Sequence, residues 1–219
     1  VVKAGGYRDC HHPEMIIWQA TQVPSRSMYL EGKGESFIPE YIRIGRRLKE
    51  CGCNEICMCC NTAHYYIEEL QKEIGLPVIN LIKEVAIRVK AIDAKKVGLM
   101  CSDGLAKVQF YDSVFAEMCP DVDIVYPSKE YQKLVTRGIC NAKNAERYTD
   151  IMDSNNPAYC FTEVTKYLVL EGVDCVIAGC TDINNVFDKP AEVLNGIAYV
   201  DSLEVLADCI TSRNENLPQ

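Results

Sequence analysis

Two cysteines stand where a thiol could carry out acid–base chemistry. Cys60 and Cys180 each close a short apolar run and are followed at once by small polar residues, in the segments CNTAH and GCTD. In both places the pattern predicts a buried strand that ends where a helix begins, so each sulfur should lie near free backbone N–H groups and the positive end of a helix dipole. Such a setting favours a thiolate. Two thiols that face each other across a cleft could move a proton between opposite faces of one carbon atom.

The segments around these cysteines resemble the cysteine-dependent, cofactor-independent aspartate/glutamate racemase family. Three motifs carry the resemblance: CNTAH from Cys60, GCTD around Cys180, and the upstream segment QVPSRS, which contains Arg26. Residues 96–104 and 200–202 are similar to the family's middle strand with its loop and to its last strand end. The matches occur in the right order and span nearly the whole chain.

The resemblance implies an amino-acid racemase that needs no cofactor and interconverts the enantiomers of aspartate or glutamate. Cys60 and Cys180 would be the catalytic pair, in which one thiolate removes the α-proton while the other thiol delivers a proton from the opposite face. His64 and Asp182 would assist them. The residues that would bind the substrate are Arg26, Asn61, Thr62, Ser102, Lys143 and Thr181.

Each of these residues also has a purely structural interpretation. Cys60 and Cys180 could be buried thiols, and Asn61, Thr62 and Thr181 are of the types that cap helices. Capping and anion binding are compatible because both use the same N–H groups. The planar fork of Arg26 suits a side-chain carboxylate, although Arg26 could also be a solvated loop cation. Likewise His64 could be structural, Asp182 could be a cap, and Lys143 could be a solvated surface cation.

The thirteen cysteines of the chain are an odd number, and most lie in apolar segments. Free buried cysteine behaves as a small hydrophobic residue, so we expect reduced thiols and a cytoplasmic location. The densest group runs from Cys51 to Cys60, but it lacks the paired C-x2-C spacing of a zinc site. In a strand, Cys57 and Cys59 would face one side and Cys60 the other. We therefore expect no metal site, and metal analysis would test the alternative of a zinc or redox module.

The charge and hydropathy of the chain exclude several partners. It has 219 residues and a formal net charge of −8, which argues against a nucleic-acid or anionic-membrane surface. No apolar stretch approaches the ~20 residues of a membrane-spanning helix. The expected partner is a small amino-acid substrate, and the resemblance implies a homodimer.

Apolar runs with strand and helix periods alternate along the chain, which predicts the α/β class. Strands are expected at residues 15–18, 55–59, 78–80, 97–101, 123–125, 175–178 and 197–200. Helices are expected at residues 38–50, 62–74, 82–91, 106–117, 131–138, 161–171 and 203–211. We predict two similar lobes, each a parallel sheet flanked by helices: residues 1–94 plus 203–219 carry Cys60, and residues 95–202 carry Cys180. The active site should lie in the cleft between them, beyond the carboxyl ends of the strands.

The resemblance also implies a strand and a glycine-rich loop at the start of the fold. The sequence instead opens with residues that are similar to the end of the following helix, and Gly5-Gly6 has no apolar strand before it. We therefore expect the first βα unit to be missing. This departure supports an alternative, a catalytically silent protein of the same fold that binds an amino acid or a partner. A related decarboxylase or cis-trans isomerase would use one cysteine differently.

Overall fold

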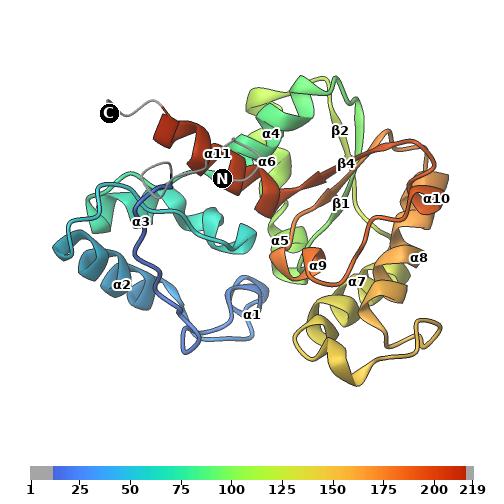
Figure 1. Ribbon diagram of the computed structural model, residues 1–219, viewed down its shortest axis with the longest axis horizontal. Helices are drawn as coiled ribbons and strands as arrows, with labels where there is room; N and C mark the ends of the chain where they lie inside the picture. Colours follow the sequence, from blue (N-terminus) through green and yellow to red (C-terminus); the bar gives the residue numbers. More distant parts are fainter. Residues whose placement is uncertain (1–11, 216–219) are drawn as a thin grey trace.

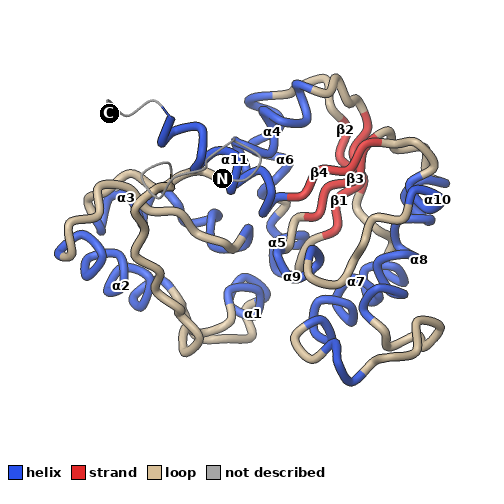
Figure 2. The backbone as a smooth tube through the Cα atoms, viewed as in Figure 1, coloured by secondary structure: helices blue, strands red, loops and turns tan. Residues whose placement is uncertain are grey.

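The strands of the molecule form one parallel sheet, which lies in one of its two halves (Figures 1 and 2). The computed structural model describes residues 12–215. The strands are β1 (Lys96–Met100), β2 (Asp123–Val125), β3 (Cys175–Ala178) and β4 (Ala198–Asp201), in the order β2-β1-β3-β4. Because β2 and β3 lie on opposite sides of β1, the loops that follow β1 and β3 diverge. That point of a parallel sheet is where ligands commonly bind.

Different helices cover the two faces of the sheet, because alternate residues of a strand point to opposite faces. Leu99 and Ile177 contribute to one buried cluster, and Met100 and Ala178 contribute to the other. The helices of the first cluster are α4 (Leu81–Ala91), α6 (Phe110–Met118) and α11 (Ser202–Glu215), and those of the second are α7 (Lys129–Ala142) and α8 (Pro157–Leu170). The sheet is therefore the middle layer of three.

The other half of the molecule is mainly helical (Figure 2). Its elements are α1 (Arg26–Glu31), α2 (Ile38–Glu50), the 3-10 helix η2 (Asn61–Tyr66) and α3 (Ile67–Ile74). Phe37, Leu70 and Val78 lie in its buried core. A single parallel bridge pairs Ile56 with Val78. The α/β class is confirmed. The parallel sheet predicted for the lobe that carries Cys60 is reduced to this one bridge in the part of the chain that the structure describes.

The sequence prediction gave the bounds of α2, β2 and β3 as the structure has them. The strand predicted at residues 15–18 is wrong: this segment is irregular, and Ile17 is 83% exposed. Within residues 12–215 no strand pairs with it, so its backbone groups gain nothing from an extended conformation. The strands predicted at residues 55–59 and 78–80 supply only the bridge. The Gly5-Gly6 departure lies outside the described residues.

Two predicted helices are each divided in the structure. The helix expected at residues 106–117 separates into α5 (Asp103–Val108) and α6, because Gln109 between them has a left-handed backbone with φ 48°. The helix expected at residues 62–74 begins as η2 and continues as α3. The shorter elements η3 (Ala145–Arg147), α9 (Thr181–Asn184) and α10 (Ala191–Leu194) complete the fold.

The last helix returns toward the first half of the chain. α11 packs against α4, and Arg213 forms an ion pair with Glu55 and another, at 3.5 Å, with Glu84. α4 itself packs against the sheet in the same core as β1 and β3. Segments of both predicted lobes therefore share this core, and the lobe boundaries given above stay a prediction.

Candidate active site

Cys60 and Cys180 occupy the same kind of turn in the two halves of the molecule. Cys60 is the residue before η2 and Cys180 is the residue before α9, and both have φ −148° in the extended region. Neither side chain caps its own helix. Both are free, partly exposed thiols. Each sulfur thus lies where an extended segment turns into a helix, as the sequence predicts.

Hydroxyl groups join the two turns across the molecule. The Thr181 hydroxyl donates a hydrogen bond of 3.2 Å to the carbonyl oxygen of Cys59. The hydroxyls of Thr62 and Ser102 lie 3.0 Å apart, and Ser102 also caps α5. These contacts bring η2 of the first half to α5 of the second, and the Cys59 carbonyl oxygen to the start of α9.

Arg26 places a positive charge beside Cys60. It is the first residue of α1, which the preceding Ser25 caps. Its guanidinium interacts electrostatically with the Cys60 side chain, and its Nη1 group donates a hydrogen bond of 3.4 Å to the Pro24 carbonyl oxygen. Burial alone would lower the pKa of Arg26, but the negative charges of Cys60, Tyr41 and Asp182 raise it above the ordinary value. The Nε atom of Arg26 is buried and has no hydrogen-bond partner among the described residues.

A close helix contact holds Arg26 at this place. The N–H of Gly104 on α5 donates a hydrogen bond of 2.9 Å to the Ser27 hydroxyl on α1. A Cβ atom at Gly104 would lie 2.5 Å from the Ser27 carbonyl oxygen. Glycine therefore allows α1 to approach α5 closely enough to position Arg26 between the two halves.

A carboxylate lies beside the other thiol. The Cys180 Sγ atom is 3.8 Å from Asp182 Oδ2. Burial, followed by the negative charge of Asp182, raises the pKa of Cys180 to about 12, and an ionised Cys60 adds to this effect. Lys143, directly after α7, pairs with Asp182 at 2.6 Å and partly opposes the rise. The surroundings of Cys180 therefore keep its thiol protonated.

Comparisons with known proteins agree with this arrangement. The family model "Asp/Glu/Hydantoin racemase" matches residues 3–210. The chain belongs to this family. It is 25% identical to the broad specificity amino-acid racemase RacX of Bacillus subtilis over 212 residues, which cover 95% of this chain and 85% of RacX. It is also 26% identical to a glutamate racemase of Limosilactobacillus reuteri, over 64% of this chain and 49% of that protein.

Solved structures show the same two-lobe fold. The Picrophilus torridus aspartate racemase superposes with a TM-score of 0.78 and 21% identity, over 98% of this chain and 85% of that one. A glutamate racemase from Francisella tularensis, solved with D-glutamate, superposes with a TM-score of 0.60 and 16% identity, over 93% and 70%. At these identities the likeness establishes the fold of this family member.

The Asn61 side chain is used inside the molecule. Its Nδ2 group donates a hydrogen bond of 2.9 Å to the Ser202 hydroxyl, and its Oδ1 atom accepts one of 2.8 Å from the Tyr111 hydroxyl. Asn61 is buried. The Asn61 side chain, which was predicted to bind substrate, therefore holds the Cys60 turn at the end of β4. In this turn, a ligand could use the backbone groups of Asn61 but not its side chain.

His64 holds the backbone of the Cys60 turn. The ring is fully buried, with Nδ1 2.8 Å from the Cys60 carbonyl oxygen and Nε2 3.2 Å from that of Ile79. Burial lowers the pKa of His64, although the contacts with carbonyl groups oppose this shift. A neutral imidazole donates through only one nitrogen. Any assistance from His64 is therefore exerted through the position of Cys60.

Sequence reasoning did not find three residues around this site. Tyr41 on α2 interacts electrostatically with both Cys60 and Arg26, and burial followed by the charge of Cys60 raises its pKa to about 12. Tyr111 and Ser202 form the buried network with Asn61. Nothing in the pattern of α2 marks Tyr41. The segment 200–202 matched the family, but this match did not predict the contact of Ser202 with Asn61.

Within residues 12–215, no three or more His, Cys, Asp or Glu side chains lie together as a metal ion would require. Over the same range, every helix is too short or too polar to cross a membrane.

Proposed function

We propose that this chain is a cofactor-independent racemase that interconverts the enantiomers of aspartate or glutamate through Cys60 and Cys180. The observation that carries the proposal is the pair of similar turns that present one thiol each, one beside a cation and the other beside a carboxylate. A reaction that takes a proton from one face of a carbon and returns it to the other needs one ionised and one protonated group.

In the proposed scheme, Cys60 acts as the base, because Arg26 is the cation beside it. Cys180 is the thiol, because burial and Asp182 raise its pKa to about 12. Cys60 removes the α-proton of one enantiomer, and Cys180 supplies the proton on the other face. The two thiols exchange roles for the reverse direction. Charge that develops on the α-carboxylate is stabilised by backbone N–H groups and by the hydroxyls of Thr62 and Thr181.

Two cations are the proposed ligands of the substrate side-chain carboxylate. Arg26 has a buried Nε atom without a hydrogen-bond partner among the described residues, and it can offer a bidentate fork. Lys143 pairs with Asp182, so the substrate would share the Lys143 ammonium group with that carboxylate. Arg26 is therefore the main determinant of acidic specificity in this proposal, and Ser102 positions Thr62.

The test follows the α-proton of aspartate, glutamate and alanine in deuterated solvent by NMR, with chiral chromatography of the products. We expect both enantiomers of one acidic amino acid to racemise and to gain deuterium, with alanine much slower. Added pyridoxal phosphate or a metal chelator should change neither rate. Binding of aspartate or glutamate by calorimetry without any exchange would instead support the catalytically silent alternative. Light scattering of the purified protein tests the expected homodimer.

A further inference from the structure

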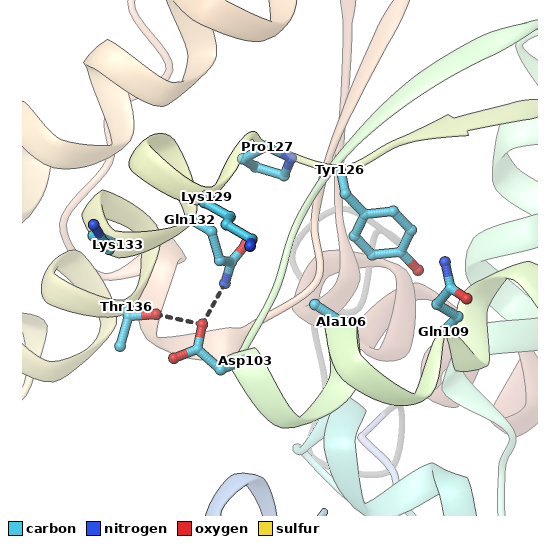
Figure 3. A pocket seen from close by; sticks show the side chains of 9 residues that line it. All are labelled: Asp103, Ala106, Gln109, Tyr126, Pro127, Lys129, Gln132, Lys133 and Thr136. Carbon is cyan, nitrogen blue, oxygen red and sulfur yellow. Dashed lines mark hydrogen bonds between the residues drawn. The ribbon is translucent and has the colours of Figure 1, made fainter. Parts of the chain in front are cut away.

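A second cavity lies beside the candidate active site, between α5 and α7 at the carboxyl ends of β1 and β2 (Figure 3). Its volume is about 550 Å³, within the ~300–1,000 Å³ typical of small-molecule sites. Its lining includes Asp103 and Ala106 from α5, Tyr126 after β2, and Lys129 and Gln132 from α7. Neither thiol of the candidate active site is among the lining residues.

A cluster of hydrogen-bonded polar side chains around Asp103 lies on one side of this cavity. Gln132 uses both of its amide hydrogens, toward the Cys101 carbonyl oxygen at 3.0 Å and toward Asp103 Oδ1 at 2.8 Å. The Thr136 hydroxyl also donates to Asp103 Oδ1, at 2.7 Å. Gln132 Oε1 is buried and receives no hydrogen bond from the described residues. The Asp103 carboxylate accepts the bonds from Gln132 and Thr136 through Oδ1, and on this side of the cavity it favours a ligand that donates hydrogen bonds.

The other walls offer positive charge and apolar surface. Lys129 is exposed at the cavity and forms no ion pair with any residue of the range 12–215. The ring of Tyr126, the methyl group of Ala106 and the buried Pro127 supply the apolar part (Figure 3). A purely apolar ligand would offer no partner to the charged groups of Asp103 and Lys129. An inorganic dianion would be repelled by the Asp103 carboxylate.

We infer that this cavity is a second small-molecule site, which takes a zwitterionic amino acid with an apolar side chain. The ammonium group lies against the Asp103 carboxylate, the ligand's carboxylate against Lys129, and the side chain against Tyr126 and Ala106. The ligand would contact Asp103, which follows Ser102, and the Ser102 hydroxyl lies 3.0 Å from that of Thr62 in the candidate active site. This assignment does not depend on the proposed racemase activity.

Calorimetric titration of the whole protein tests the assignment with three probes: L-leucine, isocaproate, which is leucine without its amino group, and isoamylamine, which is leucine without its carboxylate. We expect leucine to bind about tenfold or more tightly than either analogue, because each analogue loses one charge-assisted interaction. Inorganic phosphate should bind more weakly than leucine.

Two variants locate the site. Lys129→Met should weaken leucine and isocaproate by about tenfold and leave isoamylamine unchanged, whereas Asp103→Asn should weaken leucine and isoamylamine and leave isocaproate unchanged. Lys72→Met, at an exposed lysine remote from the cavity lining, is the matched control and should bind all three as the wild type does. Absence of leucine binding, leucine binding that both variants leave intact, or phosphate that binds as tightly as leucine would each overturn the assignment.

Discussion

The Cys60 and Cys180 turns have nearly the same backbone and opposite electrostatic surroundings. Both cysteines have φ −148° and precede a helix. Arg26 interacts electrostatically with Cys60, whereas the Asp182 carboxylate lies 3.8 Å from the Cys180 sulfur. The turn geometry is thus repeated, while the charges around it are not. In the proposed scheme, this difference assigns the base to Cys60 and the acid to Cys180.

The two turns also differ in how firmly they are held. Asn61, next to Cys60, is locked by buried hydrogen bonds to Ser202 and Tyr111. Thr181, next to Cys180, makes one hydrogen bond, to the Cys59 carbonyl oxygen. The Cys60 turn is therefore held through buried polar groups. The Cys180 turn is held by β3, by the buried Ile183 and by the Gly179 N–H, which donates a hydrogen bond of 2.8 Å to the Met100 carbonyl oxygen.

Replacing either thiol gives the largest expected effect. Cys60→Ser and Cys180→Ser should each lower the racemisation rate by about 10³-fold, the scale of a lost general acid or base. Each variant should still exchange the α-proton of one enantiomer with deuterated solvent, and the two variants should prefer opposite enantiomers. Chiral chromatography and NMR measure both quantities. Cys140→Ser, at an exposed cysteine on α7, is the control, and undiminished racemisation in either thiol variant would exclude the two-thiol scheme.

Replacing Arg26, the cation beside Cys60, gives the second-largest expected effect on the reaction rate. Arg26→Ala should lower kcat/KM for the acidic substrate by about 10²-fold, because it removes both a carboxylate ligand and the charge beside Cys60. Arg26→Lys should recover only part of the loss, since ammonium cannot form the bidentate pair. The kcat/KM for a neutral amino acid should fall much less. Equal falls in kcat/KM for acidic and neutral substrates would show that Arg26 acts only on the Cys60 thiol and does not bind the substrate carboxylate.

Changing the charges around Cys180 should shift its titration in two directions. The Asp182 charge raises the pKa of Cys180, so Asp182→Asn should lower that pKa and speed alkylation of Cys180 by iodoacetamide at a fixed pH. Lys143 lowers the same pKa, so Lys143→Met should slow the alkylation. The rate should change about tenfold for each unit of pKa shift in the range where the thiol is mostly protonated. Quantitative peptide mass spectrometry measures the modified Cys180, and shifts of the same sign in both variants would contradict this electrostatic account.

The elements that sequence reasoning found are those whose signal is local. β3 is a short run of four apolar residues, and its bounds follow from the glycines Gly172 and Gly179 on either side. The position of Cys180 after β3 follows from the same pattern, whereas the segment before Cys60 forms only the bridge at Ile56. Residues 15–18 form an equally apolar run. A strand also needs an adjacent strand that pairs with its backbone groups, and a short stretch of sequence does not show whether there is one.

The parts of the site that were not predicted depend on contacts between distant segments. Lys143 and Asp182 are 39 positions apart and form their ion pair only because α7 packs beside α9. Tyr41 reaches Arg26 and Cys60 from a separate helix. The motifs identify which residue types are available, but tertiary packing decides that Asn61 faces Tyr111 rather than a substrate.

The smallest expected effect tests the firmer hold on the Cys60 turn. Tyr111→Phe removes the donor to Asn61 Oδ1 and leaves that buried acceptor unsatisfied, which should lower the free energy of unfolding by about 1–3 kcal/mol. Tyr199→Phe is the matched control, because the Tyr199 hydroxyl is buried and has no hydrogen-bond partner among the described residues. Its removal should leave the stability unchanged or raise it. Urea denaturation measures both variants. Equal destabilisation by both variants would show that the loss of any buried hydroxyl explains the result, and not the loss of the hydrogen bond to Asn61. A larger loss of stability in Tyr111→Phe, with a modest fall in the racemisation rate, would show that the buried network stabilises the Cys60 turn.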